Sequence, residues 1–94
     1  MSKESDKHSG YKQLRYFIKQ YAPPGVSDQR AAQSFVDVEP DYLLKSLKSE
    51  LYGVSKGKYD EESMGKIVGI PRKLRHGSYD EWARLILVWM AEYK

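Results

Sequence analysis

Apolar residues recur at every third or fourth position along most of the chain, which is the spacing of a helix that buries one side. Five segments carry the pattern, namely residues 11–22, 27–36, 40–53, 60–69 and 79–93. No stretch alternates apolar and polar residues over more than four positions, as a half-buried strand would. The predicted fold is therefore all-α, a compact single domain of about five short helices.

Residues that start and stop helices support these boundaries. The Pro-Pro-Gly run at 23–25 ends the first segment, because proline lacks a backbone N–H and disfavours helix in the residue before it. Ser27 is typical of a helix N-cap. Ser78 followed by Glu81 forms the capping-box pattern just before the last helix, which makes that start well defined.

The last predicted helix, Tyr79 to Tyr93, is apolar on nearly all sides. One side carries Trp82, Leu85, Ile86, Trp89, Met90 and Tyr93, and the other carries Leu87, Val88 and Ala91. A helix without a polar face is expected to be buried on several sides, so we predict that the other helices pack around it. The alternative is that Leu87, Val88 and Ala91 stay exposed and form a protein interface, including that of a homodimer.

Length and the absence of cysteine limit the class of protein. The chain of 94 residues has the length of one domain. Residues 1–9 lack periodicity, so we expect a flexible tail followed by a helical domain at 10–94. Without cysteine, disulfides and thiolate chemistry are excluded. The polar N-terminus shows no signal-peptide pattern, and the longest apolar run, 85–91, is too short to cross a membrane. We therefore expect a cytoplasmic protein without a membrane span.

Acidic residues gather where helices are predicted to begin. Nine of the thirteen acids do so: Asp28, Asp37, Glu39, Asp41, Asp60, Glu61, Glu62, Asp80 and Glu81. The helix dipole and the unpaired backbone donors of the first turn favour carboxylates there. These acids therefore have a structural explanation that requires no catalytic pair.

Basic residues are distributed differently, in two windows that contain no acid. Residues 7–27 and 63–79 together hold eight of the sixteen cations. The candidate contacts to nucleic acid are Lys12, Arg15, Tyr16, Lys19, Lys66, Arg72, Lys73 and Arg75. Lysine and arginine would bind phosphates without reading sequence, while Tyr16 would stack on a base or shield the basic stripe. The alternative is a solvated surface that lacks acids locally.

Patterns typical of enzymes are missing. The two histidines, His8 and His76, are far apart, and no metal-binding spacing or glycine-rich phosphate loop occurs. We expect residues 71–76 to form one irregular turn, anchored by Leu74 and carrying a solvated His76. No catalytic residue, metal site or cofactor is therefore predicted.

One passage is weakly typical of a DNA-binding motif. Residues 27–48 could form two helices joined by a bend, as in a helix-turn-helix that places its second helix in the major groove. The bend lacks glycine and carries Asp37, Glu39 and Asp41, which would repel phosphates. The motif is not the preferred interpretation.

The sequence predicts a small basic helical domain that binds DNA or RNA through phosphate contacts. This hypothesis requires the two basic windows to lie on one surface of the folded protein. The competing hypothesis is a protein–protein adaptor or assembly domain, which uses the apolar last helix or pairs its basic surface with an acidic partner. Attachment to an anionic membrane surface is a third alternative, although the basic stripe of the first helix is short for it.

Overall fold

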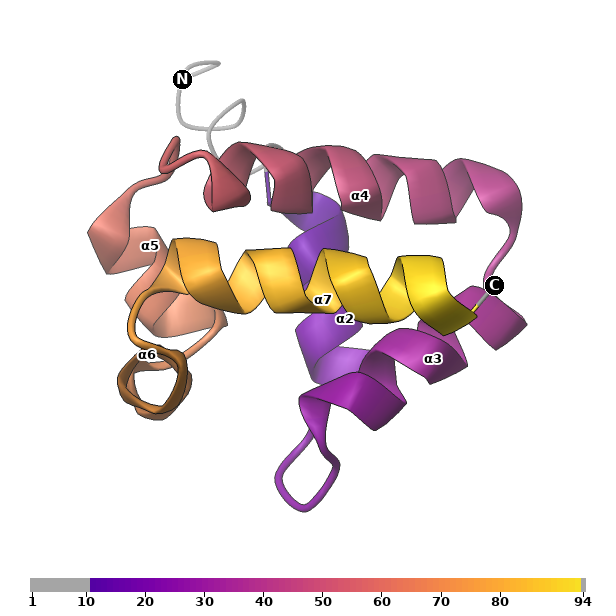
Figure 1. Cartoon of the computed structure of the whole chain (residues 1–94), viewed down its shortest axis with the longest axis horizontal. Coiled ribbons are helices and arrows are strands. Elements are labelled where there is room, and N and C mark those ends of the chain that lie inside the picture. Colours follow the sequence, from indigo (N-terminus) through magenta and orange to yellow (C-terminus); the bar gives the residue numbers. More distant parts are fainter. Residues whose placement is uncertain (1–10, 94) are drawn as a thin grey trace.

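A computed structural model of the protein describes residues 11–93, which form helices and no strand. The helices are α2 (Lys12–Tyr21), α3 (Asp28–Val38), α4 (Asp41–Ser55), α5 (Glu61–Ile67), α6 (Ile70–His76) and α7 (Tyr79–Tyr93) (Figure 1). The prediction of an all-α fold is confirmed. The tail predicted at residues 1–9 lies outside the described residues.

Helix α7 occupies the centre of the structure, as predicted. It packs against α4, α3 and α6, and α4 runs alongside it in the opposite direction (Figure 1). Its inner side consists of Trp82, Ala83, Ile86 and Met90, none of which has measurable exposure. Each large apolar side chain buried in this way contributes roughly 1.5–3 kcal/mol relative to the exposed state. This inner side therefore dominates the core.

Burial of α7 is less complete than predicted, because its outer side stays exposed. Leu85 retains 36% of its exposure and Val88 retains 46%, because no other helix of residues 11–93 covers that side. Helices α2 to α5 each contribute apolar side chains to the same core, including Phe17 of α2 and Phe35 of α3, whose rings meet edge to face at 5.7 Å. Helix α6 contributes no buried residue.

The segment predicted as an irregular turn is the helix α6, so the described residues contain one helix more than expected. Gly69 and Gly77, at φ 102° and 99°, adopt the left-handed conformation that glycine tolerates best, and they bound this helix at its two ends. Pro71 is compatible with α6 because it lies in the first turn. Leu74 does not anchor the segment, since it is 76% exposed.

The start of α2 is capped by a residue from another helix. Its own N-cap, Tyr11, makes no side-chain cap. Instead the carboxylate of Glu50 in α4 accepts hydrogen bonds from the backbone N–H groups of Gln13, at 3.1 Å, and Leu14, at 2.8 Å. These bonds satisfy two of the four donors that a helix start leaves unpaired. Glu50 therefore fixes α2 against α4.

We expect Glu50→Ala to lower the free energy of unfolding by about 1–2 kcal/mol, the usual cost of losing an N-cap. The matched control is Glu62→Ala, because the Glu62 side chain is 80% exposed and its one ion pair, with Lys66, is 3.9 Å long. The control should cost only about 0.3–1 kcal/mol, because Glu62 lies in the first turn of α5 and its loss removes a helix-dipole contribution. Urea unfolding measures both, and equal costs would contradict the capping role.

Candidate functional site

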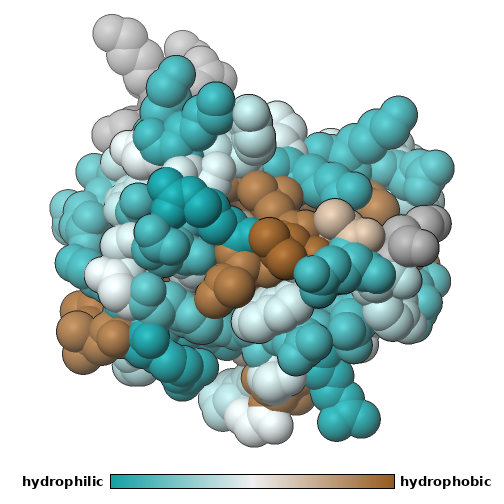
Figure 2. Space-filling model, viewed as in Figure 1, coloured by the Kyte–Doolittle hydropathy of each residue, from teal (hydrophilic) through white to brown (hydrophobic). Residues whose placement is uncertain are grey.

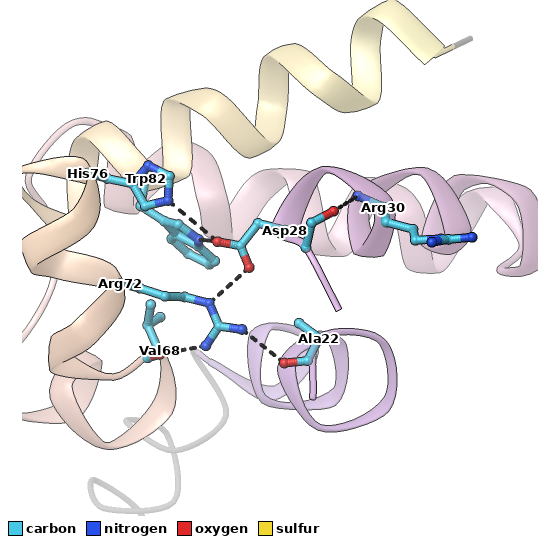
Figure 3. Close-up of polar contacts among 8 residues, drawn as sticks. Ala22, Asp28, Arg30, Val68, Arg72, His76 and Trp82 are labelled. Carbon is cyan, nitrogen blue, oxygen red and sulfur yellow. Dashed lines mark hydrogen bonds and ion pairs between the residues drawn. The ribbon is translucent and has the colours of Figure 1, made fainter. Parts of the chain in front are cut away.

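The carboxylate of Asp28 lies inside the protein, where three segments meet (Figure 3). Asp28 is 5% exposed. Its Oδ1 accepts a hydrogen bond from Arg72 Nε at 2.9 Å, and its Oδ2 accepts one from the indole N–H of Trp82 at 3.1 Å. The first residue of α3 is therefore joined to α6 and α7 through one charged group.

Arg72 has all three of its guanidinium nitrogens engaged. Besides binding Asp28, it donates from Nη1 to the carbonyl of Val68 and from Nη2 to the carbonyl of Ala22, both at 2.9 Å (Figure 3). Its side chain is 18% exposed. Arg72 was predicted to bind phosphate, but here its charge joins the end of α2 to α3, α5 and α6.

His76 lies beside the same carboxylate, so the prediction of a solvated His76 is wrong. Its Nε2 is 3.5 Å from Asp28 Oδ2, and its side chain is only 12% exposed. This nitrogen is buried and has no hydrogen-bond partner. An ion pair forms here only when the imidazole is protonated. The helical form of residues 70–76 explains the difference, because it turns His76 inward on the same side as Arg72.

The other cations of the second window differ in their partners. Lys73 forms an ion pair with Glu61 at 2.5 Å, and this hydrogen bond raises the pKa of the Lys73 ammonium. Lys66 lies 3.9 Å from Glu62 in a solvent-exposed pair. Arg75 is exposed and forms no ion pair with any acidic side chain of residues 11–93.

Some residues of the first basic window, 7–27, also contact acidic side chains. Tyr16 donates to Glu39 at 2.6 Å, and this hydrogen bond raises the pKa of its phenol. Tyr21 donates to the same carboxylate oxygen. The charge of Arg15 acts on Glu50. Lys12 and Lys19 are exposed, and neither forms an ion pair within residues 11–93.

The two windows meet in one groove, which we call the α2–α6 groove. It lies between the end of α2, the connection at 22–27 and the start of α6, and its volume is about 590 Å³. Its cations are Lys19, Arg72 and Arg75, while Ile18, Val26, Val68 and Pro71 are among its apolar residues. No acidic side chain from the described part of the chain lines it.

Only part of the predicted site converges on this groove. Five of the predicted residues do not line the α2–α6 groove, namely Lys12, Arg15, Tyr16, Lys66 and Lys73. Sequence reasoning missed the apolar lining of the groove, because the Pro-Pro-Gly run was interpreted only as a helix stop and Pro71 only as part of the turn at 71–76. Its signal in the sequence was the pair of proline-containing corners at 23–25 and 71, the second of which lies directly before Arg72.

A second candidate surface lies on the outer side of α7. Figure 2 shows an apolar patch in the middle of the face that α7 occupies, surrounded by hydrophilic residues. Among the residues predicted for a protein interface, Val88 and Ala91 are exposed and Leu87 is half-buried. Leu85, which was assigned to the other side of the helix, is exposed beside them.

Comparison with known proteins adds no functional information. No protein-family model matches the chain, and no curated protein or solved structure shows significant similarity to it. None of the helices in residues 11–93 combines the length and the apolar character that crossing a bilayer requires. Across the same residues, no three or more histidine and acidic side chains are arranged to hold a metal ion.

We expect Asp28→Ala to destabilise the protein by about 3–5 kcal/mol, because it leaves the buried charge of Arg72 unpaired. The control is Asp41→Ala, at an exposed position in the first turn of α4. Its loss should cost about 0.3–1 kcal/mol through the helix dipole. Urea unfolding compares the two, and a similar loss for both would refute the role given to Asp28.

The two glutamates that bind across helices should titrate on opposite sides of their ordinary pKa of 4.5. The hydrogen bonds from Tyr16 and Tyr21 lower the pKa of Glu39, while burial raises the pKa of Glu50. Glu39 therefore adds to the free energy of unfolding at pH values above its unfolded pKa. This contribution is lost as the pH falls through the lowered pKa of the folded state. Glu50 has the reverse dependence, so its contribution falls as the pH rises.

Carboxyl-carbon NMR titration measures both glutamate pKa values directly. Replacing Tyr16 and Tyr21 with phenylalanine should return the pKa of Glu39 towards its ordinary value and leave that of Glu50 unchanged. If Glu39 titrates at or above Glu50 in the unaltered protein, the assignment of these hydrogen bonds is wrong.

Proposed function

We propose that the protein is an interaction module without catalytic activity, and that it binds an acidic segment of a partner protein in the α2–α6 groove. An apolar side chain of the partner would enter the groove. Neighbouring carboxylates would lie against Lys19 and Arg75. The single observation that carries the proposal is the presence of exposed cations without ion pairs beside an apolar lining.

The charges of the groove favour an acidic ligand. Lys19 and Arg75 come from different helices but line the same groove, and neither is neutralised by an acid of residues 11–93. Two like charges that line one groove repel one another. A ligand carboxylate beside them relieves this repulsion and gains a charge-assisted hydrogen bond.

The apolar lining favours a protein segment over a nucleic acid. Ile18, Val26 and Pro71 offer surface that a leucine or phenylalanine of the partner could cover. Burial of such surface contributes roughly 25 cal/mol per Å², whereas a sugar–phosphate backbone has little apolar area to bury. The volume of about 590 Å³ lies within the range of about 300–1,000 Å³ that is typical of ligand pockets.

Nucleic-acid binding is the second candidate, and the placement of Lys12 and Lys19 favours it. They lie seven residues apart on one side of α2, both exposed, and Lys19 shares the groove with Arg75. These cations could follow a phosphate backbone. Arg72, Lys73 and Lys66 already have acidic partners, so a nucleic acid would have to compete for them. About three phosphate contacts would give a shallow salt dependence and weak affinity.

The groove proposal predicts that a labelled peptide of alternating glutamate and leucine binds the protein, and that Lys19→Glu with Arg75→Glu weakens binding at least tenfold. The control is Lys45→Glu with Lys58→Glu, which makes the same change in net charge at exposed positions outside the groove. Fluorescence anisotropy measures the affinities. Circular dichroism confirms that each variant is folded.

The same assay separates the two candidates. Replacing the leucines of the peptide with serine should abolish binding if the apolar lining contributes. A random-sequence oligonucleotide should bind less tightly than the peptide. Oligonucleotide binding that exceeds peptide binding and weakens as salt is raised from about 50 to 200 mM would refute the acidic-segment proposal and favour phosphate recognition.

A further inference from the structure

The outer side of α7 carries an apolar strip with opposite charges at its two ends. Leu85, Val88 and Ala91 form the strip and are all exposed. Arg84 lies at one end and Glu92 at the other. Figure 2 shows an apolar patch on the face of the molecule along which α7 runs in Figure 1, and Leu85 and Val88 are exposed large apolar residues of that helix. The strip shares no residue with the α2–α6 groove.

We propose that a second copy of this chain covers the strip. The two α7 helices would pack antiparallel about a twofold axis that passes through Val88. A twofold interface requires one surface to be complementary to itself, and the order of residues along this strip meets that requirement.

The register follows from the sequence alone. In an antiparallel pair centred on Val88, a residue before position 88 faces the residue equally far after it in the other copy. Leu85 then faces Ala91, and a large side chain meets a small one. Arg84 and Glu92 lie four residues on either side of Val88, which is about 6 Å along a helix. Each Arg84 therefore faces a Glu92 of the other copy.

The electrostatics select the antiparallel arrangement. A parallel pair would place Arg84 against Arg84 and Glu92 against Glu92, and both contacts are repulsive. Glu92 forms no ion pair within residues 11–93. Arg84 donates to Glu81 at 2.6 Å and to the carbonyl of Ser55 at 3.1 Å, and it lies 3.8 Å from the carboxylate of Asp80. Its side chain is still 51% exposed, so a further carboxylate can approach it.

The strip is small, so we expect a weak dimer rather than an obligate one. Three short apolar side chains in the centre of the contact fall short of the interfaces of about 1,200–2,000 Å² that stable complexes bury. The dimer should therefore form and dissociate with protein concentration.

Sedimentation equilibrium over a hundredfold range of protein concentration tests this inference. The unaltered protein should shift from monomer to dimer. Val88→Glu should raise the dissociation constant at least tenfold, because it places two carboxylates together on the axis. The matched control is Leu74→Glu, which introduces the same change at an exposed position of α6 and should leave the dissociation constant unaltered.

Charge exchange tests the register. Arg84→Glu alone and Glu92→Arg alone should each weaken self-association, because each pairs like charges. An equimolar mixture of the two variants should dimerise, since both contacts then join opposite charges. Glu92→Arg and Val88→Glu change only exposed side chains. If Arg84→Glu does not fold, these two variants still test the interface, because each should weaken self-association.

Two results would overturn the inference. A protein that remains monomeric at every concentration has no such interface. A dimer that resists Val88→Glu, or variants that fail to associate when mixed, would place the contact elsewhere. Lys19→Glu with Arg75→Glu should not affect dimerisation, so failure of this inference and failure of the groove proposal can be told apart.

Discussion

A carboxylate that is removed from water requires donors around it, and Asp28 obtains them only because distant segments converge. Arg72 and Trp82 lie 44 and 54 residues away in the sequence, and both donate to it. Arg72 in turn binds the carbonyls of Ala22 and Val68. The Asp28–Arg72 ion pair and its hydrogen bonds therefore position five parts of the structure. These are the end of α2, the start of α3, the end of α5 and the helices α6 and α7. A short basic helix such as α6, which has no buried residue of its own, depends on this contact for its place.

The same interaction determines which positive charges remain for a partner. In the sequence, Arg72, Lys73 and Arg75 form one basic cluster. In the structure, Arg72 is bound to Asp28 and Lys73 to Glu61, whereas Arg75 remains exposed beside Lys19. Folding thus reduces a broad basic stretch to a few cations at the edge of an apolar groove. That arrangement suits carboxylates next to apolar side chains better than it suits an extended phosphate backbone.

The sequence predicted what local chemistry determines. Helical periodicity identified the fold class, and Ser27 and Asp60 cap α3 and α5 through side-chain bonds to Arg30 and Ser63. It could not predict contacts that depend on tertiary packing. Glu50 caps α2 from 36 residues away. Asp28 has the sequence pattern of an ordinary first-turn acid, and only the packing of α6 and α7 against it shows that it is buried. The bonds that join Arg72 to Asp28, Val68 and Ala22 could not be predicted for the same reason.

The exposure of Leu85 and Val88 follows from the position of Trp82. The indole N–H must point at Asp28, and this fixes the rotation of α7 about its axis. Trp82, Ile86 and Met90 then face the core, because residues four apart lie on one side of a helix. Leu85, Val88 and Ala91 lie on the side turned away. Any rotation that buried them would withdraw the donor from Asp28 and expose the tryptophan. The apolar outer strip is therefore imposed by the buried carboxylate, and a second copy of the chain can cover it without disturbing that contact.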